Sequence, residues 1–104
     1  MSRTLYAYAG SSGAAVKHLI GATALAGATE VTETTWAGAP ALRVELTTPM
    51  PSTGERLLWK VAGSINDGGT VDLHDCSLWL DADTLAAIHA ALAMAWGVDS
   101  EVTS

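Results

Sequence analysis

Three side chains with metal-binding or catalytic chemistry, Asp72, His74 and Cys76, stand two residues apart in the second half of the chain. In a β-strand this spacing would point all three to one face of the sheet. Zinc accepts Cys, His and Asp ligands, and a cysteine nucleophile needs a neighbouring histidine. However, alternate residues of a strand lie roughly 7 Å apart, too far for a direct hydrogen bond. We therefore predict no metal site, interpret Cys76 as a small buried residue of ordinary thiol reactivity, and keep an enzyme that uses His74 and Cys76 as the third of three hypotheses.

A second candidate is the turn Gly10-Ser11-Ser12-Gly13, which lies between an expected strand and an expected helix. A glycine-rich turn at a helix N-terminus can hold a phosphate group. The turn matches neither the dinucleotide-binding pattern nor the P-loop pattern. A small-molecule or nucleotide-binding module is therefore the alternative hypothesis, with Ser11, Ser12 and Gly13 as ligands and His89 in a pocket. Otherwise Ser11 or Ser12 caps the helix, and His89 is a core or boundary histidine with one hydrogen bond.

The four tryptophans are the largest side chains available for a core or a contact surface. A core of this size holds at most two of them, so the others face solvent or a partner. Trp79 is the best candidate for exposure, because simple alternation puts it opposite Leu78 and Leu80. Exposed tryptophan is enriched at binding hot spots, although the favoured interpretation is that Trp79 is half covered by the chain's own loops.

The C-terminal helix expected over residues 83–96 has no charged residue from Thr84 to Val98. Its core face is expected to hold Leu85, Ile88, His89, Leu92 and Trp96. Its opposite face carries small or adaptable side chains instead of the usual charged ones. Such a face is buried inside the chain, filled with alanine for helix propensity, or covered by a partner. The predicted partner-binding residues are Trp79, Ala87, Ala90, Ala91 and Met94.

The elements that must position these residues indicate an α+β fold with the order β-α-β-β-β-β-α. We expect four to five mostly antiparallel strands with two helices on one face. The pattern of apolar residues predicts strands over 3–9, 29–36, 41–48, 55–63 and 70–80. A break or bulge is expected near Asp75 or Cys76, where alternation fails. Helices are predicted over 14–26 and 83–96, the latter opened by an aspartate cap at Asp81-Ala82-Asp83.

Length and composition set the remaining limits. The 104 residues suit one domain over 1–97, followed by a frayed acidic tail over 98–104. A net charge of −6, with only five scattered Lys and Arg residues, argues against nucleic acid as a partner. The single cysteine excludes an intrachain disulfide. No apolar run suits a membrane span or a signal segment, so we expect a cytoplasmic protein without membrane contact.

The leading hypothesis that follows is a non-enzymatic protein-binding or assembly factor without a cofactor. The partner would be another protein or a second copy of this chain, and the apolar C-terminal helix face would be the contact surface. An accessory protein of a phage or an actinobacterium fits this composition.

Overall fold

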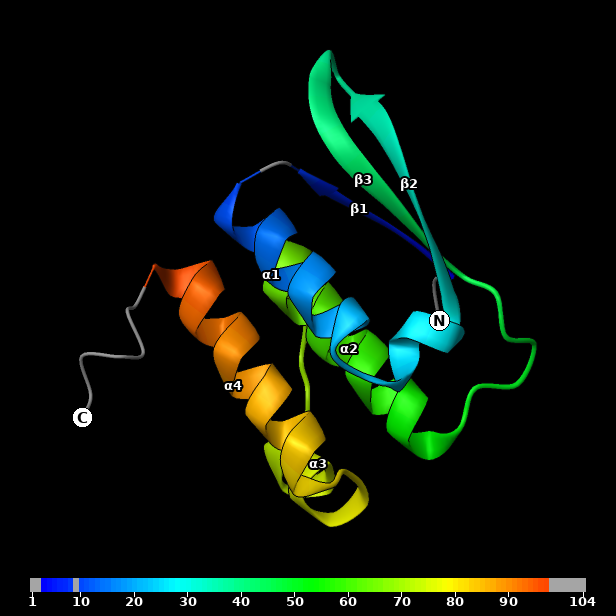
Figure 1. The fold of residues 1–104 in the computed structure, drawn as a ribbon, viewed down its shortest axis with the longest axis vertical. Helices are drawn as coiled ribbons and strands as arrows, with labels where there is room; N and C mark the ends of the chain where they lie inside the picture. Colours follow the sequence, from blue (N-terminus) through cyan, green and yellow to red (C-terminus); the bar gives the residue numbers. More distant parts are fainter. Residues whose placement is uncertain (1–2, 9, 98–104) are drawn as a thin grey trace.

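The computed structural model of this chain describes residues 3–8 and 10–97. The acidic tail expected over 98–104 lies outside the described residues. A single sheet has the strand order β1-β3-β2, with both neighbouring pairs antiparallel. The elements along the chain (Figure 1) are β1 (Thr4–Tyr8), α1 (Ser11–Gly21), the 3-10 helix η1 (Ala24–Gly27), β2 (Thr29–Trp36), β3 (Ala39–Leu46), α2 (Thr53–Asp67), α3 (Leu73–Trp79) and α4 (Ala82–Trp96).

The prediction of four to five strands with two helices is wrong, because the described residues form three strands and four α-helices. The strand expected over 55–63 belongs to α2. Ser52 and Glu55 form a capping box: the Glu55 N–H donates to Ser52 Oγ at 3.1 Å, and the Ser52 N–H donates to Glu55 Oε1 at 2.8 Å. The helix then buries five residues at helical spacing, Leu57, Leu58, Trp59, Val61 and Ala62.

The strand expected over 70–80 is also wrong, because this segment contains α3. The Asp72 carboxylate accepts hydrogen bonds from the backbone N–H groups of His74 and Asp75 at 2.9 and 3.2 Å. It thereby caps the helix N-terminus. The failure of alternation near Cys76 therefore reflects a helical turn and not a bulge.

The first helix begins and ends earlier than the expected range 14–26. Helix α1 ends at Gly21, and Thr23 starts the separate turn η1 by accepting a hydrogen bond from the Leu25 N–H. The three strands expected over 3–9, 29–36 and 41–48 correspond to β1, β2 and β3.

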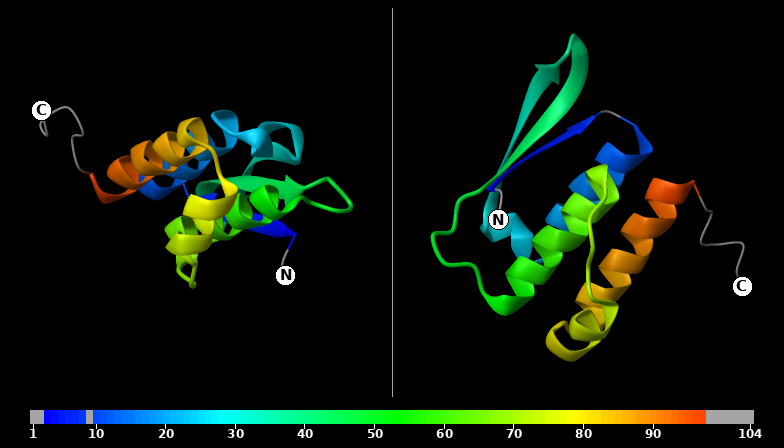
Figure 2. Two further views of the ribbon diagram at one scale, coloured as in Figure 1. Left: turned by 90° about the horizontal axis from the view of Figure 1, so that it is seen from below. Right: turned by 180° about the vertical axis from the view of Figure 1, so that it is seen from behind.

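The helices and the sheet form two layers (Figures 1 and 2). Helices α1 and α4 lie in the front layer of Figure 1, while α2 lies beside β1 and extends the layer of the sheet. The Asn66 side chain ties α2 to β1 by donating a hydrogen bond to the Tyr6 carbonyl oxygen at 2.8 Å. The apolar core runs between the layers, and its largest fully buried side chains are Leu19, Leu25, Leu58, Val16 and Val44.

The sheet has one covered face and one open face. Leu5, Ala7 and Val44 point into the core with α1. Alternation along β1 turns Tyr6 and Tyr8 to the opposite face, where both are exposed. No residue of β2 is buried, and the β2–β3 hairpin reaches beyond the helices (Figure 1).

Helix α4 confirms the predicted C-terminal helix and part of its predicted core face: Ile88 is buried and Leu85 and Leu92 pack half-buried against the core, whereas His89 and Trp96 are exposed. Asp81 caps its start, and Gly97 ends it with a left-handed φ of 68°. The buried residues are Ala87, Ile88 and Ala91. Since α4 packs mainly on α1, the small side chains of Ala87 and Ala91 allow the two helices to approach closely.

Gly13 joins the first turn of α1 to the end of β1. A Cβ atom added at Gly13 would overlap the carbonyl oxygen of Tyr8. Only glycine therefore permits α1 to start this close to the strand that precedes it, which sets how α1 lies on the sheet.

Replacing Gly13 by alanine tests this close approach. We expect Gly13→Ala to lower the free energy of unfolding by about 1–3 kcal/mol, the usual cost of overpacking. Gly21→Ala is the matched control in the same helix, since a Cβ there meets no atom within 4 Å. Alanine at that position should be neutral or stabilise by up to about 1 kcal/mol. Urea unfolding followed by circular dichroism measures both, and an unchanged midpoint for Gly13→Ala would contradict the contact.

Candidate functional site

The most developed surface feature is a set of three exposed aromatic side chains on the open face of the sheet, Tyr6, Tyr8 and Trp36, which we call the aromatic face. Their exposed fractions are 37%, 47% and 48%. Tyr6 and Tyr8 alternate with core residues along β1, and Trp36 ends β2 just before a two-residue turn. That turn, Ala37-Gly38, has positive φ at both positions (52° and 82°), which suits the twist of a hairpin.

The rings of Tyr6 and Trp36 meet although β3 lies between their strands. Their centroids are 4.9 Å apart with an interplanar angle of 32°. The β3 residues paired with Tyr8 and Trp36 are Ala41 and Ala39, whose small side chains leave room above the sheet. Ala41 is only 6% exposed on this open face, and all three aromatic residues line one groove. The aromatic face is therefore one contiguous surface.

A groove of about 530 Å³ adjoins the aromatic face and continues to the C-terminal half of α2. We call it the aromatic groove. Its second wall is polar: Asn66 is held by its bond to β1, and Ser64 Oγ donates to the Gly69 carbonyl at 3.0 Å. The remaining lining includes one cation, one anion and two glycines of positive φ, namely Lys60, Asp67, Gly68 and Gly69. Aromatic walls with a few polar groups are typical of ligand and peptide grooves.

A second hollow, of about 680 Å³, lies between α2 and the start of α3. Asp72, His74 and Asp75 line it together with Lys60. The Asp72 carboxylate is already engaged as the cap of α3. In the part of the chain that the structure describes, no three His, Cys, Asp or Glu side chains are placed to hold a metal ion.

The structure does not bring Asp72, His74 and Cys76 together. In a helix, residues two positions apart point to different sides. His74 is exposed, whereas Cys76 is 3% exposed and faces the core. Burial of the thiol, followed by the negative charges of Asp72 and Asp75, raises the pKa of Cys76. A raised pKa lowers the thiolate fraction at neutral pH, so we now expect a thiol less reactive than an ordinary one.

The turn over Gly10–Gly13 has a packing role in the structure. Gly10 occupies the N-cap position without a side-chain cap, so neither Ser11 nor Ser12 caps α1. Gly13 is buried against Tyr8. His89 is exposed on α4, not part of the core, and neither hollow described above includes it or the turn.

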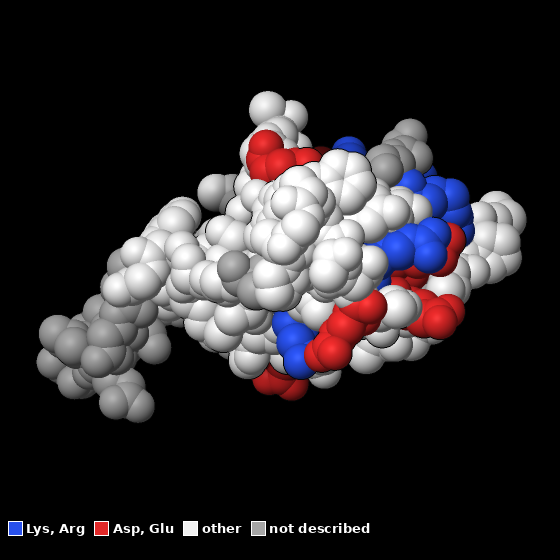
Figure 3. Space-filling model, turned by 90° about the horizontal axis from the view of Figure 1, so that it is seen from above, with Lys and Arg blue, Asp and Glu red and all other residues white. Residues whose placement is uncertain are grey.

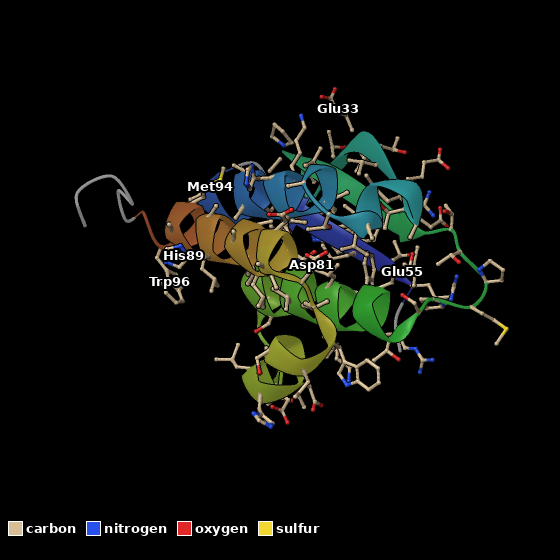
Figure 4. All side chains as sticks on the ribbon, turned by 60° about the horizontal axis from the view of Figure 1, so that its bottom comes forward. Glu33, Glu55, Asp81, His89, Met94 and Trp96 are labelled. Atoms are coloured by element: carbon tan, nitrogen blue, oxygen red, sulfur yellow. The ribbon has the colours of Figure 1, made fainter. Side chains whose placement is uncertain are left out.

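The predicted partner-binding residues occupy three different environments. Trp79 is 63% exposed, although it lies on a helix and not on the expected strand. Ala87 and Ala91 are buried, and Ala90 is half-buried. Figure 4 shows Met94 on the side of α4 nearer α1, with His89 and Trp96 on the outer side. The apolar face of α4 thus meets α1 of the same chain, and these five residues do not form one surface.

Sequence reasoning missed the aromatic face. The alternation of Tyr6 and Tyr8 with core residues was visible, and so was Trp36 at the end of a strand. Their meeting depends on β3 lying between β1 and β2, which no local pattern reveals.

Comparisons with known proteins add no family assignment. No family model matches the sequence. No curated protein and no solved structure matches it either. Among the described residues, no helix combines the length and the apolarity needed to cross a bilayer.

The reactivity of Cys76 tests its placement. At neutral pH we expect iodoacetamide to alkylate Cys76 about tenfold or more slowly in the folded protein than in the urea-unfolded chain, because the thiolate is the reacting form. Mass spectrometry of timed samples gives both rates. Equal rates would contradict a buried thiol with a raised pKa.

The same raised pKa of Cys76 predicts a pH dependence of stability. As pH rises past the ordinary thiol range, about 8.5, the unfolded chain loses its thiol proton while the folded chain keeps it. Stability should therefore fall with rising pH, and level off above the folded pKa. Urea unfolding of wild type and Cys76→Ala between pH 7 and 10 gives the free energy of unfolding of each at each pH. The difference between the two curves isolates the contribution of Cys76, since the other groups titrate equally in both proteins. Parallel curves would contradict the prediction.

Proposed function

We propose that this protein is a non-enzymatic binding module that holds a segment of a partner protein against the aromatic face. The observation that carries the proposal is the contact between Tyr6 and Trp36 across β3, together with the groove that both residues and Tyr8 line. Aromatic residues are enriched at the centres of protein interfaces, and a few such side chains supply most of the binding energy.

The aromatic face supports this role better than the helix surface expected from the sequence. Ala87 and Ala91 are already covered by the chain's own fold. Trp79 and Trp96 are exposed at 63% and 72%, but each is the only tryptophan of its helix. On the aromatic face, by contrast, residues of two strands converge. The contact surface in the proposal is therefore the sheet and not α4.

A small molecule in the aromatic groove is the second candidate. Its volume of about 530 Å³ lies within the usual range for small-ligand sites, about 300–1,000 Å³. Lys60 and Asn66 would supply polar contacts in place of the Gly10–Gly13 turn. A thermal shift with nucleotides or metabolites that disappears in Trp36→Ala would favour this candidate.

A catalytic role for His74 and Cys76 gains no support from the geometry, because α3 turns one toward solvent and the other toward the core. The proposal assigns the cytoplasm as compartment, since a single cysteine needs no oxidising environment. An accessory role in a phage or a bacterium is compatible with it, and the partner is a protein other than this chain or a second copy of it.

Tryptophan substitutions test the proposal. Tagged wild type, Trp36→Ala and Trp96→Ala are used to retain partners from a lysate of the native cell, and a retained protein is purified and titrated by calorimetry. A hot-spot loss of about 2 kcal/mol or more corresponds to roughly 30-fold weaker binding for Trp36→Ala. Trp96→Ala removes a more exposed tryptophan on α4 and should bind within about twofold of wild type. Tyr8→Ala checks the same face without altering the hairpin turn.

The same titrations can overturn the proposal. A partner that binds wild type and Trp36→Ala with the same affinity, but loses affinity in Trp96→Ala, would move the contact surface to α4 and overturn the proposal.

A further inference from the structure

The outer edge of β2 is an open hydrogen-bonding edge. Two bonds establish which backbone groups face which way: the Leu46 N–H donates to the Arg3 carbonyl at 2.8 Å, and the Thr47 N–H donates to the Ala28 carbonyl at 2.8 Å. Because antiparallel pairs alternate, β2 residues of even number face β3. The backbone groups of Val31, Glu33 and Thr35 therefore point away from the sheet.

No described element lies beyond this edge. The strand order puts β2 at the margin of the sheet, and Figure 1 shows the hairpin standing clear of the helices. β2 is eight residues long and has no buried residue. An edge of this length with free amide and carbonyl groups is a template for an added strand.

The charges beside the edge are unbalanced. Glu30 stands directly opposite Glu45 in the register, and like charges in that position are destabilising. The cation near them, Arg43, pairs with Glu45 at 3.5 Å. Glu33 lies on the other face of β2, and Figure 4 shows it projecting away from the body of the molecule. Figure 3 looks down on the molecule from the top of Figure 1. On that surface the Lys, Arg, Asp and Glu side chains lie in a few groups, and most of the surface is uncharged.

We infer that the edge of β2 receives an extended, basic segment of the partner as a fourth strand. A partner Lys or Arg opposite Glu30 would neutralise one carboxylate of the facing pair Glu30 and Glu45. A second partner Lys or Arg, three positions along the added strand and on its other face, would lie opposite Glu33. The fourth strand would also lie beside Trp36, at the end of the aromatic face. This inference rests on the proposed function and names the class of partner.

A second copy of this chain fits the edge less well. Pairing two β2 strands would bring together two copies of Glu30 and Glu33, and β2 has no basic residue to offset them. Charged residues on an edge strand are a common protection against such self-pairing.

The probe is a nine-residue capped peptide of alternating Thr and Val, with two lysines three positions apart. One control peptide carries glutamate in place of both lysines. The other keeps the lysines but carries N-methyl groups on the backbone nitrogens along one edge of the peptide strand. NMR titration of the ¹⁵N-labelled protein should show saturable shifts over residues 29–36 with the lysine peptide alone. Hydrogen exchange of the Val31, Glu33 and Thr35 amides should slow on binding.

Protein variants separate strand addition from attraction between charges. Val31→Pro removes an outward N–H without touching the β3 ladder and should abolish binding, whereas Val31→Ala keeps the N–H and should bind within about twofold of wild type. Glu30→Gln and Glu33→Gln should each weaken binding by about 1.5- to 5-fold, the range of an exposed ion pair. Asp83→Asn, which changes the net charge equally but lies on α4, should not.

The outcomes distinguish this inference from the proposed function. No saturable binding of the lysine peptide, or equal binding to Val31→Pro and Val31→Ala, would overturn strand addition. If the native partner requires Trp36 but binds Val31→Pro normally, the aromatic face stands as the site and the added strand falls. If light scattering shows a dimer that Val31→Pro dissociates, a second copy occupies the edge and the inferred partner is wrong.

Discussion

The close packing of α1 on one face of the sheet is the contact on which the rest of the structure depends. Its first turn abuts the end of β1 at Gly13, where only glycine fits beneath the Tyr8 carbonyl. From there α1 buries Val16, Leu19 and Ile20 in the shared core. Because α1 is placed centrally, it also receives α4 and makes contact with α2. One helix thus holds both layers together.

Covering one face of the sheet leaves the other open, and this asymmetry produces the surfaces with a proposed role. The strand β1 divides its side chains between the core and the aromatic face by simple alternation. On the outer side of β1, Asn66 of α2 bonds the Tyr6 carbonyl and the aromatic groove lies between the two elements, whereas no described element lies beyond the outer edge of β2. The aromatic face and the β2 edge therefore meet near Trp36. Every described side chain with a charge lies at the surface, since the buried set is wholly apolar.

The elements predicted correctly are those whose local signals do not compete. Residues 29–36 are rich in Thr and Val, and the final helix has an aspartate cap, a long apolar run and a terminal glycine. In 55–63 the signals conflict: Leu57, Trp59 and Val61 alternate as in a strand, yet Leu57, Leu58, Val61 and Ala62 also suit a helix. The S-x-x-E pattern at Ser52–Glu55 would have favoured the helix. Helix α3 is short, and the apolar residues of 70–80 also fit the two-residue period of a strand. The capping signal at Asp72 was therefore outweighed by the strand pattern.

By itself the sequence determined the α+β class, three strands, the last helix and the burial of Cys76, because these follow from residue type and short-range spacing. Only the tertiary structure decided which apolar surfaces are covered. From the sequence, the alanine side of α4 could be buried in the chain, filled with alanine for helix propensity, or covered by a partner; the structure buries Ala87 and Ala91, and α4 packs mainly on α1, whereas Met94 stays exposed. Tyr6 and Trp36 looked unrelated, but the strand order β1-β3-β2 brings their rings together. The physical reason is the same in both cases: local pattern says which side of an element is apolar, whereas long-range packing alone says what meets it.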